Sequence, residues 1–142
     1  MIVVIRIGGL VKVKREVAET LDRLRLRRKY SCVIIDEKNN EIMSMVKKVR
    51  DFIGYGEIDQ VTLAKLIKAR GKRTDKKEIS ETEAENIAKE IMTGKKLKDT
   101  ELKPFFRLHP AKGGFKSTKL HYPKGVLGSH GKDIVKLLER ML

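Results

Sequence analysis

Two short runs of β-branched residues, separated by a helical pattern, constrain this chain more than any other feature. Ile2–Ile7 is almost continuously β-branched and ends at Gly8-Gly9, as is typical of a strand covered on both faces. Cys32–Ile35 repeats this pattern. Between the two runs, apolar residues at spacings of four, four and three share one helical face: Val13, Val17, Leu21 and Leu24. The pattern therefore predicts a central first strand, a helix and a second buried strand.

The next segment repeats the alternation. Apolar residues from Ile42 to Val49 form the stripe of a second helix, and Phe52–Ile58 alternates apolar with small residues, as a less regular third strand does. We expect Gly54 and Gly56 to permit a close approach of another part of the backbone. The element order predicts an α+β fold with a ferredoxin-like βαβαβ core. We expect parallel neighbouring strands in this core and helices on one face of its sheet.

Weaker patterns follow this core. Val61–Arg70 has the pattern of a short helix closed by Gly71, and Ser80 with Glu83 forms a capping box for a helix that runs to Gly94. Phe105–Leu108 is predicted as the last strand. The final amphipathic helix is predicted from the spacing of Ile134, Leu137, Leu138 and Met141.

A chain of 142 residues has room for one ordinary domain. We therefore expect one compact unit with three parts: a ferredoxin-like core at residues 1–71, a variable helical insertion at 72–103, and a basic loop with a C-terminal helix at 104–142, packed on the core. The insertion has mixed charges, as a peripheral segment does, and we expect it to matter least for function.

The charge of the chain predicts a polyanionic partner. The formal net charge is +14 and the pI is near 10.0, while 40% of the residues are hydrophobic. A disordered basic tail lacks that apolar fraction, so the composition favours a folded nucleic-acid-binding protein. Five of the seven residues from Arg23 to Lys29 are basic. This cluster lies near the basic residues that follow the first strand only if both loops share one end of the sheet.

The segment from Pro104 to Lys132 contains six Lys and Arg residues, no Asp or Glu, and every proline and histidine of the chain. Its glycines and prolines favour an extended loop. Phe115 and Tyr122 alternate with lysines, a spacing in which rings stack on bases or pack beneath the loop. We expect the loop to be mobile without RNA, because like charges repel and few apolar residues hold it.

Catalytic and metal-binding patterns are weak. Neither Lys116-Ser117 nor Gly131-Lys132 stands in the frame of a phosphate-binding loop. The three histidines have no nearby cysteine or carboxylate to complete a zinc site, and Cys32 lies in a strand interior. No apolar run is long enough to span a membrane. We therefore expect no enzyme activity, no cofactor, no metal, no small-molecule substrate and no membrane partner.

The basic side chains of these loops, with two histidines, are the candidates for RNA contact: Lys12, Lys14, Arg15, Arg25, Arg27, Arg28, Lys29, Arg107, His109, Lys112, Lys116, Lys119, His121, Lys124 and Lys132. Arginine suits bidentate contact with phosphate or guanine. Arg25, Arg27, Arg28 and Arg107 are therefore the strongest candidates.

Three motifs add a resemblance to a known family. Leu24–Arg28 before the second strand, Met45–Glu57, and Arg107–Gly114 resemble the universal large-subunit ribosomal protein family L-thirty, in its archaeal form related to eukaryotic L-seven. The resemblance covers about residues 1–58 and 104–142. Many members have glycine where Arg25 stands, so the chain departs from the family pattern at this position.

The resemblance implies a structural role in the large ribosomal subunit and a ribosome-bound, cytoplasmic location. The implied partners are large-subunit rRNA, including 5S rRNA, and neighbouring large-subunit ribosomal proteins. Two alternatives stay open on the residues alone, a non-ribosomal nucleic-acid-binding module and an RNA-processing factor.

Overall fold

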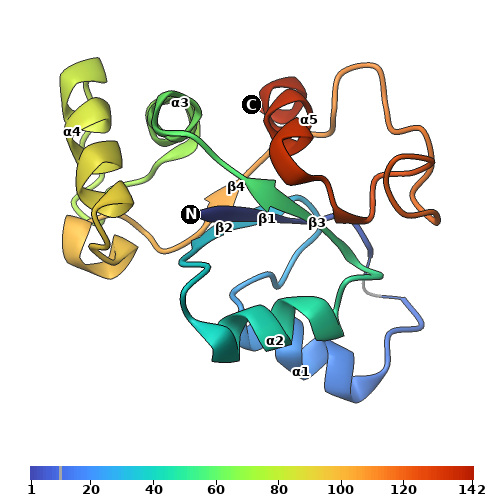
Figure 1. Ribbon diagram of the computed structural model, residues 1–142. Coiled ribbons are helices and arrows are strands. Elements are labelled where there is room, and N and C mark those ends of the chain that lie inside the picture. The colour runs from blue at the N-terminus through green and yellow to red at the C-terminus, as the bar shows by residue number, and fades with distance from the viewer. Residues whose placement is uncertain (10) are drawn as a thin grey trace.

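The N-terminal β-branched run is the central strand of a five-stranded mixed sheet (Figure 1). The computed structural model describes residues 1–9 and 11–142. The strands lie in the order β4-β2-β1-β3-β5. Their bounds are β1 Ile2–Arg6, β2 Ser31–Ile35, β3 Ile53–Glu57, β4 Phe106–Arg107 and β5 Gly128–Ser129. All five residues of β1 are buried, which confirms the prediction of a strand covered on both faces.

Helices cover both faces of the sheet (Figure 1). The helices are α1 Arg15–Arg23, α2 Asn40–Lys48, α3 Gln60–Arg70, α4 Glu81–Met92 and α5 Ile134–Met141, with short 3₁₀ turns at Leu97–Thr100 and Gly131–Asp133. On one face Ile2 and Val4 pack with Leu21 of α1 and Val46 of α2. On the other face Val3 and Ile5 pack with residues of α3, α4 and α5. The expectation of helices on one face therefore holds for α1 and α2 but not for the later helices.

The βαβαβ order was predicted correctly, so the fold is α+β with a ferredoxin-like core, but the predicted parallel pairing is wrong. β1 pairs antiparallel with β2 and antiparallel with β3. The chain leaves β1 at one end of the sheet, α1 carries it away, and residues 24–30 return it to the same end before β2 begins. A sequence pattern does not distinguish this connection from a crossover, because both have the same order of elements.

The predicted strand at Phe105–Leu108 is β4, but it is shorter than expected and is not the last strand. β4 pairs antiparallel with β2, whereas β5 pairs parallel with β3 at the opposite edge. β5 escaped prediction because its two residues are Gly128 and Ser129, which carry no β-branched signal.

The two glycines of β3 permit the close approach that the sequence predicts. A Cβ atom on Gly54 would lie 2.8 Å from the Val126 carbonyl oxygen. A Cβ atom on Gly56 would lie 2.8 Å from the Cβ atom of Ile134 and would also collide with the Gly131 carbonyl oxygen. The segment that contains β5 and the start of α5 therefore packs directly on the backbone of β3.

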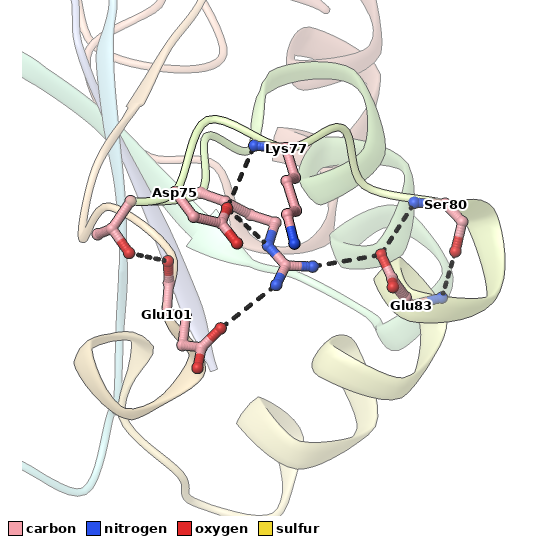
Figure 2. Close-up of polar contacts among 7 residues, drawn as sticks. Asp75, Lys77, Ser80, Glu83 and Glu101 are labelled. Carbon is pink, nitrogen blue, oxygen red and sulfur yellow. Dashed lines mark hydrogen bonds and ion pairs between the residues drawn. The ribbon is translucent and has the colours of Figure 1, made fainter.

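The insertion is closed at its base by polar contacts. Arg73 and Leu102 form an antiparallel bridge, and the Lys103 backbone N–H donates to the Lys72 carbonyl at 2.9 Å. The Arg73 guanidinium lies 3.2 Å from Asp75, 3.5 Å from Glu83 and 3.3 Å from Glu101 (Figure 2). Figure 2 also shows the capping box predicted at the start of α4, in which Ser80 and Glu83 bond reciprocally.

Substitution of Gly56 by alanine tests the close packing on β3. We expect G56A to lower the free energy of unfolding by about 1–3 kcal/mol, because the added methyl group forces the backbones apart. G9A is the matched control, since a Cβ atom on Gly9 meets nothing within 4 Å, and its effect should stay within about 0.5 kcal/mol. Urea unfolding measures both, and equal effects would contradict the packing argument.

Candidate nucleic-acid interface

One end of the sheet collects the basic loops of the chain. The register pairs Ile5 with Cys32, Arg6 with Ile53, Ser31 with Arg107 and Gly54 with Gly128. The end of β1, the start of β2, the start of β3, the end of β4 and the start of β5 therefore lie together. We call this the basic end, and it faces right in Figure 1.

Four segments meet at the basic end: residues 7–9 with 11–15, residues 26–30, residues 47–52 and residues 107–127. Their only carboxylate is that of Asp51, and Asp51 lies 2.8 Å from Nε2 of His121. The basic groups after β1 and before β2 thus share one end of the sheet. This was the condition for the two clusters to lie near each other. The remaining positive charge of these segments has no acidic partner within them.

Arg6 joins the first two of these segments from inside the protein. Its side chain is 2% exposed. Nε donates to the Gly8 carbonyl at 3.0 Å, Nη1 to the Leu26 carbonyl at 2.6 Å and Nη2 to the Gly9 carbonyl at 3.1 Å. Burial lowers the pKa of this guanidinium, but arginine still carries its proton at neutral pH. The three carbonyl dipoles stabilise the buried charge, and in return the charge fixes both loops.

The long loop between β4 and β5 is held against the same end. The rings of Phe115 and Tyr30 lie 6.2 Å apart between centroids. Arg140 of α5 donates from Nε to the Lys112 carbonyl at 2.9 Å and from Nη2 to the Gly114 carbonyl. Together with the pair of His121 and Asp51, these contacts join the loop to three other parts of the chain.

Both loop aromatics have partners within the protein. Phe115 packs on Tyr30, and the Tyr122 ring lies 4.6 Å from the His130 ring while its hydroxyl donates to Asp133. Of the two roles that the sequence left open for these rings, the structure therefore supports packing. The loop also has more apolar anchors than we expected, since Leu108, Ala111, Val126 and Leu127 are buried. Its mobility without RNA stays a prediction.

All candidate residues for RNA contact are exposed, and most of them lie at the basic end. They belong to three segments: Lys12, Lys14 and Arg15 after β1; Arg27, Arg28 and Lys29 before β2; Arg107, His109, Lys112, Lys116, Lys119, His121 and Lys124 at and after the end of β4. Ion pairs of Arg15 with Glu19 at 3.2 Å and Arg27 with Asp22 at 2.6 Å are exposed. Such surface pairs are weak, so these side chains remain free to exchange partners.

Two candidates lie apart from the others. Arg25 lines a groove beside β2 together with Val33 and Lys95. Lys132 follows Gly131, whose carbonyl lies against Gly56 near the far end of β3. The structure therefore does not bring Arg25 and Lys132 together with the rest.

Sequence reasoning missed Lys47, Lys48 and Arg50. Lys47 and Lys48 are in the last turn of α2, and Arg50 lies in the turn before β3, which begins at the basic end. Three cations in four residues could have been recognised in the sequence as a basic cluster. Its position at the basic end could not, because that position depends on the direction of β3 in the sheet. These three residues join the candidate interface.

Other kinds of site have little support among the described residues. No group of three or more His, Cys, Asp and Glu side chains in residues 1–9 and 11–142 is arranged to hold a metal ion. Cys32 is fully buried, which raises the pKa of its thiol well above the usual range. None of the helices in the same part of the chain combines the length and the apolar character needed to cross a membrane.

Arg25 also ends helix α1 in the left-handed conformation, with φ at 63°. Its N–H donates to the Asp22 carbonyl at 3.0 Å, and the Leu26 N–H donates to the Leu21 carbonyl at 2.9 Å. This pair of bonds is a Schellman motif, in which glycine is the preferred residue. The structure thus explains why glycine suits this position in the resembling family.

R25G should therefore raise the free energy of unfolding by about 1 kcal/mol, since glycine removes the strain of the left-handed backbone. R28G is the matched control, because Arg28 has no positive φ and glycine there should destabilise by about 0.5–1 kcal/mol. Urea unfolding of the two variants checks the opposite signs. A loss of stability in R25G would refute the motif.

The lowered pKa of His130 makes the free energy of unfolding depend on pH. Burial lowers its pKa and outweighs the Val126 hydrogen bond and the Asp133 charge, which both raise it. Nε2 donates to the Val126 carbonyl at 2.5 Å. Below about pH 6.5 the unfolded chain takes up a proton more readily than the folded one. This contribution to stability is therefore present above that pH and is lost as the pH falls.

H130Q tests this prediction, because glutamine retains an N–H donor but does not titrate. We expect the free energy of unfolding to fall less in H130Q than in the wild type between pH 7.5 and pH 5.5. Urea unfolding at the two pH values measures the difference. An identical fall in both proteins would show that His130 contributes nothing to it.

Comparison with known proteins agrees with this geometry. The family model described as ribosomal protein L30p/L7e matches residues 2–53. The large ribosomal subunit protein uL30 of Archaeoglobus fulgidus is 41% identical over 152 residues, and that of Methanocorpusculum labreanum is 37% identical over 153 residues, each covering 99% of both chains. The uL30 protein of Pyrobaculum aerophilum is 38% identical, with 98% of this chain and 92% of the relative covered. Since these relatives match almost the whole chain, the chain belongs to the uL30 family of ribosomal proteins.

Proposed function

We propose that this chain is a structural constituent of the large ribosomal subunit and that its basic end binds rRNA. The relatives are named large ribosomal subunit proteins. The observation that carries the proposal is the meeting of four basic segments at one end of the sheet. The only carboxylate within these segments, that of Asp51, is paired with His121. The chain acts by binding, not by catalysis, and is ribosome-bound in the cytoplasm.

The mechanism is electrostatic. Lysine and arginine side chains replace the counterions of the RNA backbone, and the release of those ions favours binding. Arg6, Arg140 and the ring contact of Tyr30 with Phe115 hold the loops in one arrangement. A preformed surface loses less conformational entropy on binding than free loops do. The chain therefore brings together RNA segments that are distant in RNA sequence.

The finer assignments belong to the same proposal. We include 5S rRNA among the partners, because the resemblance to the L-thirty family implies it, and neighbouring ribosomal proteins on the remaining surface. The contact residues are the exposed candidates at the basic end together with Lys47, Lys48 and Arg50. The insertion contributes less, because its own charges nearly balance and Arg73 closes it at the base.

Binding to deproteinised large-subunit rRNA should depend strongly on salt. If about six phosphates are contacted, the affinity should fall by about five decades for each tenfold rise in monovalent salt. A filter-binding titration at several salt concentrations measures this slope, with 5S rRNA titrated separately. A flat response would contradict the proposal.

Charge removal at two loops makes the test specific to the basic end. R28Q/K116Q removes one cation before β2 and one from the long loop, and it should reduce the slope by about two. K38Q/K89Q is the matched control, because Lys38 follows the far end of β2 and Lys89 lies on α4, and it should leave the slope unchanged. Equal effects of the two pairs would show that the cations act only through net charge.

A further inference from the structure

A second basic surface lies beside the basic end, where α3 ends and β4 leaves the sheet. A hollow of about 280 Å³ opens between these segments. Four of the side chains that line it are basic: Arg70, Lys72, Arg107 and His109. Arg107 and His109 were candidates from the sequence, whereas Arg70 and Lys72 were not. The fold therefore joins cations that are more than thirty positions apart in the chain.

The hollow has no acidic residue in its lining. Within residues 1–9 and 11–142, no ion pair joins any of its four basic side chains to a carboxylate. Arg73 provides the contrast, since it lies next to the same segment and contacts three carboxylates (Figure 2). The charge of Arg73 stabilises the chain itself, whereas no carboxylate of the described structure pairs with the basic side chains of the hollow, and Arg107 has the ring of Phe105 as its neighbour, 5.6 Å from the guanidinium carbon to the ring centroid.

Arg70 adds a second, independent observation. Its Nε atom is buried and makes no hydrogen bond within the described structure. A buried N–H without an acceptor costs about 1–3 kcal/mol, and no acceptor within the described structure offsets that cost at Arg70. The Nε atom of Arg73 also lacks a hydrogen bond, but a carboxylate oxygen of Asp75 lies 3.2 Å away and compensates its charge.

A simpler explanation covers only part of the cluster. Arg70 is in the last turn of α3, where a cation interacts favourably with the negative end of the helix dipole. That interaction does not require Arg107 and His109, which reach the same hollow from the end of β4. Convergence of cations from two elements on one concave surface is the arrangement expected around an anion.

We propose that this hollow binds one phosphate group of an RNA backbone. The inference rests on the proposed function and extends the RNA surface from the basic end round the β4 edge to the end of α3. Arg70 and Arg107 supply guanidinium groups suited to phosphate oxygens, Lys72 supplies a point charge, and the His109 imidazole donates an N–H in either protonation state. Lys72 is the first residue of the insertion, the part of the chain that we expected to matter least. The proposed phosphate contact gives this residue a function.

The double variant R70Q/K72Q tests the hollow, with K38Q/K89Q as a control that removes the same charge elsewhere. Binding to deproteinised large-subunit rRNA is measured at several salt concentrations. We expect R70Q/K72Q to bind at least about tenfold more weakly at 0.1 M salt and to lower the salt slope by about two. If R70Q/K72Q matches the control, the hollow is not a phosphate site.

Three further measurements keep the outcome decisive. K72R retains the charge of Lys72 and should bind within about twofold of the wild type, whereas a loss as large as that of R70Q/K72Q would indicate a structural role. K72Q changes only an exposed side chain, should fold normally, and should lower the slope by about one. Thermal unfolding of each variant checks the fold.

The source of the phosphate is tested with short RNAs that carry either a 5′-phosphate or a 5′-hydroxyl group. An equal effect of R70Q/K72Q on both supports an internal phosphodiester, and an effect on the 5′-phosphate RNA alone overturns that assignment. The two proposals fail in different ways. A wild-type protein without salt-dependent rRNA binding contradicts the proposed function, whereas normal wild-type binding with an inert R70Q/K72Q variant contradicts the hollow alone.

Discussion

The buried guanidinium of Arg6 is the interaction on which the candidate interface depends. It donates to the carbonyl groups of Gly8, Gly9 and Leu26, which belong to the loop after β1 and the loop before β2. Each hydrogen bond from a charged donor contributes about 1.5–3 kcal/mol. No carboxylate is needed, because three oriented carbonyl dipoles stabilise the charge. Two loops that carry like charges and repel each other are thereby held side by side.

Arginine has two different roles in this molecule, and only its surroundings distinguish them. Arg6, Arg73 and Arg140 use their guanidinium groups to hold loops or to close the insertion. Arg28, Arg70 and Arg107 have no carboxylate partner among the ion pairs of the described residues. The guanidinium groups of the first set contact carbonyl or carboxylate oxygens of the chain itself. The second set is not matched by carboxylates of the chain, and the surface that it forms suits a polyanion.

Periodicity predicted the elements of the fold well, because the strands and helices of the core bury regular apolar faces. It failed where no side-chain signal exists. β5 consists of Gly128 and Ser129 and forms because Gly54 and Gly56 let a second backbone approach β3. The glycines that admit this contact were visible in the sequence, but the segment that uses them was not. The antiparallel pairing of β1 was equally hidden, since strand direction depends on how residues 24–30 return the chain.

The sequence by itself determined the charge of the chain, the order of its core elements and its resemblance to the L-thirty family, because composition and local spacing carry these properties. Only the tertiary structure decided which cations lie together. Residues 7–9 with 11–15, 26–30, 47–52 and 107–127 share one end of the sheet, Arg25 and Lys132 lie apart from it, and Arg70 meets Arg107 beside it. The reason is physical: a strand's direction and register are set by pairing between distant segments, and these place each loop at one end of the sheet or the other.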